Sequence, residues 1–169
     1  MKAKKSKNRI LTLFGSGETS PHMAKNYRHI IDGLSYDLQK NLLLDTPFGF
    51  QENNMILSKK IQDYFASKIN LKLKILNLTS EESYSNEHTA LLSNADFIFS
   101  GPGSPTYASK IWLKHNLGDV LKNKLKSGVV MAFASAAALT LGRYVIPVYE
   151  IYKVGDLQGL NEGLNVLDF

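Results

Sequence analysis

Short apolar, β-branched runs alternate with longer amphipathic stretches along the chain, and this alternation constrains the fold more than any other feature. Repeated strand–helix units of this kind build a parallel sheet, because each helix returns the chain to the edge where the next strand begins. The strands are expected at residues 10–14, 41–44, 71–78, 96–99 and 129–133, and the main helices at 23–34, 54–69, 87–93, 106–113 and 120–125. The sequence therefore predicts an α/β fold with a mostly parallel central sheet.

Length and charge indicate one domain with a basic tail. A chain of 169 residues with 44% hydrophobic content can bury one sizeable core, and no repeat or linker divides it. The net charge is +5, but five of the 20 basic residues lie at positions 1–9. No aromatic residue interleaves with them to stack on bases, so we expect a solvated tail and no nucleic-acid partner.

Several classes of protein are disfavoured by what the sequence lacks. No run approaches the ~20 apolar residues of a bilayer span, and the N-terminus lacks the apolar stretch of a secretory signal, so we expect a cytoplasmic protein without a membrane partner. Cysteine is absent, which leaves a hydroxyl, an amine or a carboxylate as the nucleophile of any covalent chemistry. No histidine or carboxylate pair stands at ligand spacing on one element, so neither metal nor cofactor is expected.

Glycine-rich and polar loops follow the expected strands. Because ligands of parallel sheets bind beyond the carboxyl ends of the strands, these loops are expected to share one rim. They comprise residues 15–21, 45–50, 79–88, 101–105 and 134–137. Gly17 and Glu18, in the first loop, are candidates for substrate binding.

Ser135 lies at an expected junction between a strand and a helix. Its neighbours are small, as in Ala134, Ala136 and Ala137, and this suits the sharp turn of a nucleophile elbow. The motif G-x-S-x-G is not met, because Phe133 and Ala137 occupy its glycine positions. Serine is also a preferred N-cap, so a nucleophile and a simple helix cap are both open interpretations.

Four segments together resemble a known superfamily. They are residues 101–107 (GPGSPTY), 135–138 (SAAA), 141–143 (LGR) and 147–155 (PVYEIYKVG). The chain, from about Ile10 onward, resembles the class I glutamine amidotransferase-like superfamily. Within it, the chain is most similar to the serine peptidase family of dipeptidase E and cyanophycinase and to type 1 glutamine amidotransferase-like proteins. This resemblance implies a flavodoxin-like three-layer α/β/α sandwich.

The resemblance also implies a reaction. These proteins use an elbow serine, an acid some fifteen residues later and a histidine further downstream, and Ser135 and Glu150 fall on the first two positions. True glutamine amidotransferases use cysteine, which this chain lacks, so the resemblance implies a serine hydrolase that cleaves a small amide or peptide bond through an acyl-enzyme. The implied substrate is a small molecule or peptide, and the relatives suggest a small acidic amide.

The third triad position lies beyond this sequence. The family histidine is expected shortly after Phe169, so the chain is expected to be truncated at its C-terminus relative to the family. General-base assistance is commonly worth ~100- to 10,000-fold, and only His22 and His88 lie near the expected rim as substitutes. The carboxylate of Glu150 needs a partner, for which a histidine or Arg143 would serve.

An oxyanion would need fixed N–H donors beside Ser135. The backbone N–H of Ala136 and one from Gly103 or Ser104 would supply them if the two turns face each other. The alternative for residues 101–105 is a simple turn after a strand, since glycine and proline punctuate loops generally.

Two rival functions remain open. One is a non-catalytic ligand-binding or oligomerising domain that has lost its base, with a homodimer as the default assembly. The other is nucleotide binding, because the loop 15–20 and Asp45 partly mimic a dinucleotide fingerprint. Glu18 argues against the second, since it would repel phosphate at a helix N-terminus.

Overall fold

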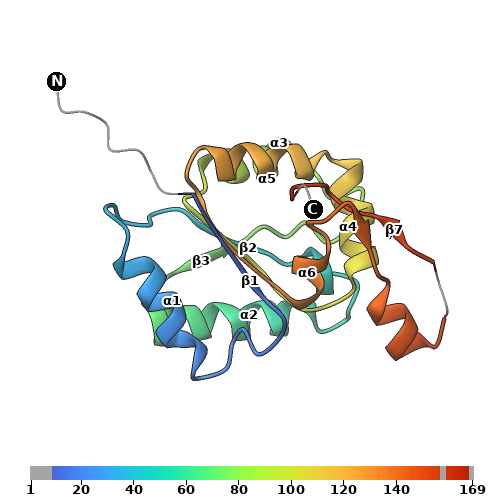
Figure 1. Cartoon of the computed structure of the whole chain (residues 1–169), viewed down its shortest axis with the longest axis horizontal. Helices are drawn as coiled ribbons and strands as arrows, with labels where there is room; N and C mark the ends of the chain where they lie inside the picture. Colours follow the sequence, from blue (N-terminus) through green and yellow to red (C-terminus); the bar gives the residue numbers. More distant parts are fainter. Residues whose placement is uncertain (1–8, 157–158, 168–169) are drawn as a thin grey trace.

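The computed structural model describes residues 9–156 and 159–167. A five-stranded sheet lies between two layers of helices (Figure 1). This is the predicted three-layer α/β fold. Residues 1–8 of the predicted basic tail lie outside the described residues.

The central sheet is parallel throughout and has the strand order β1-β5-β4-β2-β3. Every residue of β4 and β5 is buried, as expected of central strands covered on both faces, whereas β1 is an edge strand with partly exposed residues. The strands are β1 (Ile10–Phe14), β2 (Asn41–Leu44), β3 (Leu73–Ile75), β4 (Phe97–Ser100) and β5 (Val130–Ala134).

Helices cover both faces of this sheet (Figure 1). The first face carries α1 (Met23–Asp32), α2 (Asn54–Tyr64) and the π-helical turn η2 (Phe65–Ile69). The second carries α3 (Asn86–Asn94), α4 (Pro105–Lys114), α5 (Leu117–Lys126) and the short α6 (Ser135–Leu139).

Alternation along the strands fills both cores, because successive side chains point to opposite faces. Phe97 and Phe99 pack with Phe65 on the first face, at ring-centroid distances of 5.9 and 4.7 Å. Trp112 packs edge-on to Phe133 on the second face and donates from Nε1 to the Thr46 hydroxyl at 2.9 Å. This bond fixes η1 (Thr46–Phe48), the helical turn that follows β2, against α4.

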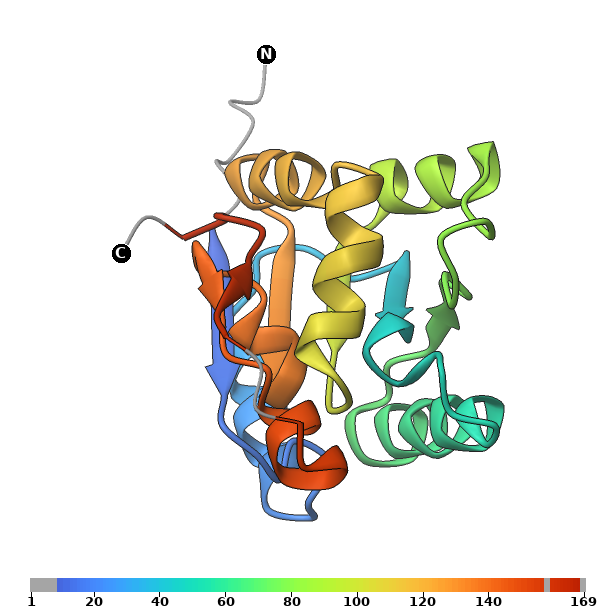
Figure 2. The same cartoon turned by 90° about the vertical axis from the view of Figure 1, so that its right-hand side faces the viewer.

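The C-terminal segment, orange to red in Figure 2, returns to the end of α6. Leu164 N–H donates to Thr140 O, and Val166 N–H to Leu141 O, each at 2.8 Å. The segment contains the π-helical turn η3 (Glu150–Val154) and the antiparallel pair β6 (Tyr144–Val145) and β7 (Asn161–Glu162).

The predicted bounds of β1 and β2 match the structure, whereas the predicted strand at 71–78 is paired only over Leu73–Ile75. The chain turns at Asn77, which has a φ of 62° and donates its N–H to the Asp45 carboxylate. Among the described residues, no helix has the length and apolar character needed to cross a bilayer.

Candidate active site

The sheet order gathers three loops at one edge of the molecule. β5 lies between β1 and β4, and the strand registers pair Ala134 with Phe14 and Phe133 with Ser100. Parallel strands end at the same edge, so the turn after β5 adjoins the loops that follow β1 and β4. These loops contain the predicted site residues other than Glu150.

Ser135 occupies a strained turn. Its φ is +51°, a left-handed conformation that costs a non-glycine residue about 1–2 kcal/mol. Ala134, still in extended conformation, is the N-cap of α6, and no side chain caps this helix. The structure therefore corrects the N-cap interpretation of Ser135. Ala134 is the N-cap, and Ser135 is the first residue of α6.

The residues around Ser135 permit this turn. Ala134, Ala136 and Ala137 are buried, and their methyl groups leave room for neighbouring backbone to pass. Ala137 N–H donates to the carbonyl of Gly101 at 3.2 Å, which ties the turn to the loop after β4. The N–H of Ala136 lies in the first turn of a helix, where it has no intrahelical acceptor. It is therefore suited to bind an oxyanion.

The loop after β4 holds the other donors considered for an oxyanion. Ser104 N–H already donates to Pro47 O at 2.8 Å, whereas no hydrogen bond from Gly103 N–H is found among the described residues. Of the two alternatives, the geometry favours Gly103. Its φ is +140°, and a Cβ there would lie 2.0 Å from Pro47 O, so only glycine fits.

The side chain of Ser104 connects α4 to Glu150. Its hydroxyl oxygen accepts from Tyr107 N–H at 2.9 Å, as an N-cap, and donates to Glu150 Oε1 at 2.5 Å. Thr106 donates to Glu150 Oε2 at 3.2 Å. Glu150 is thereby fixed beside the loop that carries Gly103, and neither Arg143 nor a histidine is bonded to it among the described residues. Thr106 was not a predicted site residue.

Glu18 is buried at the same edge. Its exposed fraction is 7%, and its Oε1 lies 3.7 Å from the position of a Cβ on Gly101. No hydrogen bond or ion pair to this carboxylate is found within the described part of the chain. A positive φ at Gly17 (+73°) forms the turn that directs Glu18 inward, and Ser20 N–H closes it on Gly17 O. Its oxygens are not among the fully enclosed polar atoms of the described chain that lack a partner, so a donor group of a ligand can reach them.

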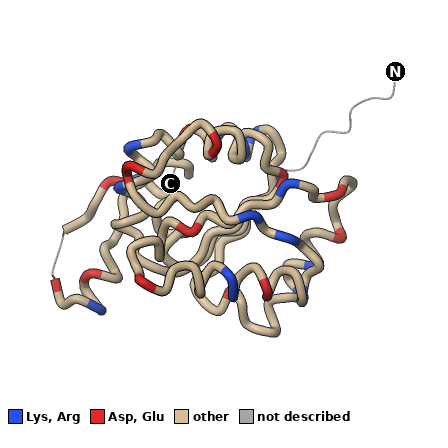
Figure 3. The backbone as a smooth tube through the Cα atoms, turned by 180° about the vertical axis from the view of Figure 1, so that it is seen from behind, with Lys and Arg blue, Asp and Glu red and all other residues tan. Residues whose placement is uncertain are grey.

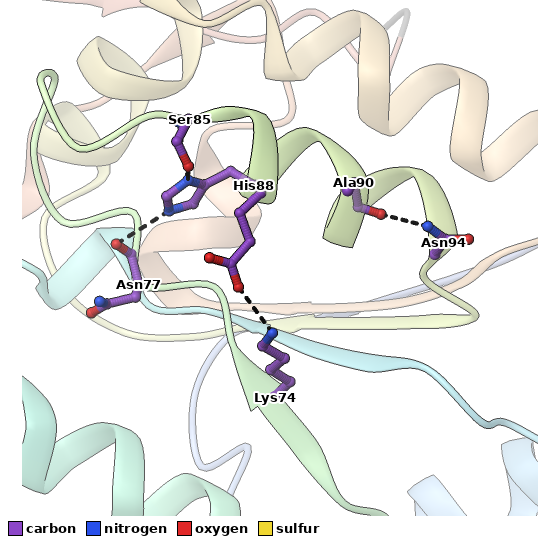
Figure 4. Close-up of polar contacts among 7 residues, drawn as sticks. Lys74, Asn77, Ser85, His88, Ala90 and Asn94 are labelled. Atoms are coloured by element: carbon purple, nitrogen blue, oxygen red, sulfur yellow. Dashed lines mark hydrogen bonds and ion pairs between the residues drawn. The ribbon is translucent and has the colours of Figure 1, made fainter.

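His88, one of the two predicted substitute bases, has partners of its own. His88 bonds through Nδ1 to the Ser85 hydroxyl at 2.8 Å and reaches Asn77 O at 3.5 Å through Nε2 (Figure 4). This pair is the capping box of α3. Its loop follows β3, three strands and about 14 Å from β5. His88 is therefore not a substitute base for Ser135.

The other histidines are also accounted for. His115 stacks on Tyr84 at 4.4 Å and bonds to Glu81 O, on the same side of the sheet as His88. His22 and His29 are exposed, at the start and in the last turn of α1. Because His22 follows the loop after β1, the strand next to β5, its role as a substitute base stays a prediction. Among the described residues, no histidine hydrogen-bonds to Ser135.

Asp45 is held in place by contacts within the fold. It is 1% exposed and accepts from Asn77 N–H at 2.9 Å. Burial raises the pKa of its carboxyl, against the effect of the backbone N–H donors and of His88. Because Asp45 joins β2 to the chain after β3, it is not exposed for a ribose, and the dinucleotide interpretation loses one of its two supports.

Larger cavities lie away from this edge. One of about 550 Å³ opens between α3 and the amino ends of β2 and β3, where Lys74 pairs with Glu87 at 3.2 Å (Figure 4). Lys40, which also lines it, bonds to Asn94. Volume alone does not make a catalytic site, and this cavity lies at the amino ends of the strands, whereas ligands of parallel sheets bind beyond the carboxyl ends. We therefore locate the candidate active site at the carboxyl edge, on the strained serine.

Among the described residues, neither the distribution of charge nor a group of metal ligands points to a functional site. Figure 3 shows basic and acidic positions interspersed over the described backbone. The described residues contain no group of three or more metal-ligating side chains.

Sequence reasoning missed an aromatic pocket beside Glu150. Its volume is about 170 Å³, and it is lined by Phe50, Ser104, Tyr107, Tyr149, Glu150 and Val154. The one available signal was the placement of Phe50 and Tyr149 in segments rich in glycine and proline, where large apolar residues have no obvious core to join.

The fold and this edge define a three-layer α/β protein with a strained serine turn, and two solved structures share the architecture. A crystal structure of a peptidase from an acI-B1 Actinobacterium is 22% identical, with a TM-score of 0.74, over 96% of this chain and 67% of that one. A protein of Listeria monocytogenes EGD-e, provisionally named peptidase E, is 16% identical, with a TM-score of 0.67, over 96% of this chain and 76% of that one. The chain has this peptidase E-like fold. No protein-family model and no curated protein matches it.

Proposed function

We propose that this protein is a serine hydrolase of the peptidase or amidase type, with Ser135 as its nucleophile. The observation that carries the proposal is the positive φ of Ser135 at the end of a central strand. A strained residue of this kind persists only where the surrounding structure enforces it, and such residues concentrate at active sites. The resemblance to dipeptidase E and cyanophycinase, and the peptidase names of the two similar structures, support the same reaction class.

The proposed reaction is acyl transfer. Ser135 Oγ attacks the substrate carbonyl carbon, and the N–H groups of Ala136 and Gly103 stabilise the negative oxygen. The C–N bond breaks, and the proton from Oγ passes through a base to the leaving amine. Water then attacks the acyl-enzyme and releases the acid.

The carboxylates have supporting roles in this proposal. Glu18 receives an N–H or a cationic group of the substrate, because residues 9–156 and 159–167 give its carboxylate no hydrogen-bond or ion-pair partner. Glu150 is the acid of the proposed triad: the hydroxyls of Ser104 and Thr106 fix it, and each of its oxygens retains a lone pair for a further donor. The base it would orient is the histidine that the resemblance implies.

The second candidate is a non-catalytic binding domain of the same fold. It is favoured by one observation, which is that no histidine hydrogen-bonds to Ser135 among the described residues. The two candidates differ in whether the Ser135 hydroxyl reacts when a base is provided.

A fluorophosphonate probe tests this difference. The serine oxygen displaces fluoride from phosphorus, and added imidazole can act as the missing base. We expect labelling that increases with imidazole and is lost in Ser135→Ala. Ser85→Ala is the matched control, because Ser85 contacts a histidine yet has no proposed catalytic role. Labelling that survives Ser135→Ala, or is absent at every imidazole concentration, would contradict the hydrolase proposal.

A further inference from the structure

The cavity of about 550 Å³ is a groove between one face of α3 and the amino ends of β2 and β3, and we call it the α3 groove. The helix lines it with Glu87, Ala90, Leu91 and Asn94. Their spacing of i, i+3, i+4 and i+7 places all four on one helix face. The volume lies in the range of roughly 300–1,000 Å³ that is typical of small-molecule sites. The groove is therefore large enough for a whole ligand, at the opposite end of the strands from the candidate active site.

The strands contribute three lysines to the α3 groove. Leu42 of β2 belongs to the core of the face that α3 covers, and alternation directs Lys40 to the same face. Lys74 of β3 pairs in register with Leu42, and Lys72 lies two residues earlier. Lys40 and Lys72 are therefore neighbours on adjacent strands, which lie about 4.8 Å apart. All four side chains line the groove, so three ammonium groups surround one leucine.

These three ammonium groups have one acidic partner in the groove. Lys74 extends from β3 to α3 and pairs with Glu87 at 3.2 Å (Figure 4), but both side chains are more than half exposed, so the pair is weak. Lys40 donates to a neutral side-chain amide of α3 at 3.3 Å. The Lys72 ammonium has no hydrogen-bond or ion-pair partner within the described ranges. Asp96 accepts the backbone N–H of Lys40 but does not line the groove. Like charges on neighbouring strands repel one another, and a bound anion would offset this repulsion.

Apolar side chains lie between the charged ends of the helix face. Ala90 is exposed and Leu91 is partly exposed, whereas Glu87 and Asn94 occupy the two ends of the face. Covering apolar surface stabilises a complex by about 25 cal/mol per Å² removed from water. A ligand with an apolar body can gain this stabilisation along α3 while its charged group reaches the lysines.

We propose that the α3 groove binds a small carboxylate with an extended apolar body, of the medium-chain acyl type. The carboxylate lies among Lys40, Lys72 and Lys74, and the chain lies along Ala90 and Leu91. Because the groove is at the amino ends of the strands, this ligand is not the substrate of the proposed hydrolase. The inference therefore does not depend on the reactivity of a serine.

Three probes separate the contributions of charge and apolar surface. Octanoate carries both, octanamide replaces the carboxylate by a neutral amide, and acetate lacks the chain. By NMR titration of the whole chain, we expect octanoate to bind with a Kd on the order of 1 mM and each of the other two about fivefold more weakly or worse. The shifted amides should centre on Leu42, Ala90 and Leu91. Equal binding of octanoate and either other probe, no binding of octanoate, or shifts centred elsewhere would overturn the proposal.

Two pairs of variants locate the binding. Lys72→Gln should weaken octanoate binding about threefold, and Ala90→Trp, whose indole occupies the space of the chain, about tenfold or more. Their controls make the same chemical changes at exposed positions of α2 and η2, on the other face of the sheet: Lys60→Gln and Ala66→Trp. Unchanged binding in either groove variant would contradict the site, as would an equal loss in its control.

A further variant separates this inference from the proposed function. Ser135→Ala should bind octanoate as tightly as wild type, because Ser135 lies at the other end of the strands. Weaker binding in this variant would place the ligand at the carboxyl edge and overturn the proposal. Failure of the fluorophosphonate reaction, in contrast, would refute the hydrolase proposal alone.

Discussion

The loops after β5 and β3 each present a serine at the carboxyl end of the sheet, but only the second serine contacts a histidine. Ser85 bonds to His88 at 2.8 Å and caps α3, so its polar groups are satisfied within the chain. Ser135 adopts a strained φ among buried alanines, with the unpaired Glu18 carboxylate in a neighbouring loop. A Ser–His contact can thus be purely structural, whereas backbone strain marks the turn that we propose to be reactive.

The largest expected effect on stability concerns the loop that faces the Ser135 turn. Gly103→Ala would place a methyl group 2.0 Å from Pro47 O at a φ of +140°, so we expect a loss of about 3 kcal/mol or more in the free energy of unfolding. Urea denaturation measures this loss. Gly15→Ala is the control, because nothing lies within 4 Å of its added Cβ. Similar midpoints for the two variants would show that the close approach of Gly103 to Pro47 is not enforced.

A second prediction concerns the histidine-bonded serine. Ser85→Ala removes a reciprocal helix cap and should cost about 1 kcal/mol of unfolding free energy. In a double-mutant cycle with His88→Ala, the combined loss should be smaller than the sum of the single losses, since both residues serve one cap. Additive losses would mean that the two side chains act independently.

Replacing the strained serine by glycine should increase the free energy of unfolding, whereas the two preceding substitutions decrease it. Ser135→Gly relieves a left-handed φ, and we expect it to raise the free energy of unfolding by up to about 1 kcal/mol while abolishing fluorophosphonate labelling. The thermal midpoint measures the gain. A destabilised glycine variant would show that the Ser135 side chain itself supports the fold, which is the structural role we assign to Ser85.

The smallest expected effect on stability concerns Glu81, in the loop that precedes Ser85. Lys110 and Lys114 donate to Glu81 and lower the pKa of its carboxyl to about 2 from an ordinary value of 4.5. A lowered pKa contributes stability above pH 4.5 that is lost as the pH falls toward 2. Glu81→Gln should therefore flatten the decline of the thermal midpoint in this range. Parallel pH profiles of wild type and variant would contradict the pairing.

The sequence was most informative where a periodic pattern and burial act together. The continuous apolar run of β5 and the alternating strands predicted the parallel sheet, because both faces of such strands must be covered. The length of the edge strand β3 was overestimated, since the apolar residues of this segment continue beyond the point where Asn77 turns the chain.

Site details depended on contacts that sequence spacing does not encode. Nothing in the sequence indicates that Ser104 N–H is used by Pro47 or that Phe50 meets Tyr149, because these pairs come together only through the sheet order. The φ of Ser135 is likewise imposed by its surroundings, since alanine and serine have no preference for the left-handed region.

The most direct test of the central claim is to map the modified residue after wild-type protein reacts with fluorophosphonate and imidazole. Tandem mass spectrometry can locate the adduct, and Ser135 and Ser85 then compete within one molecule. We predict that the adduct lies on Ser135, with Ser85 unmodified. An adduct on Ser85, or none on Ser135, would contradict the assignment of the strained turn as the reactive site.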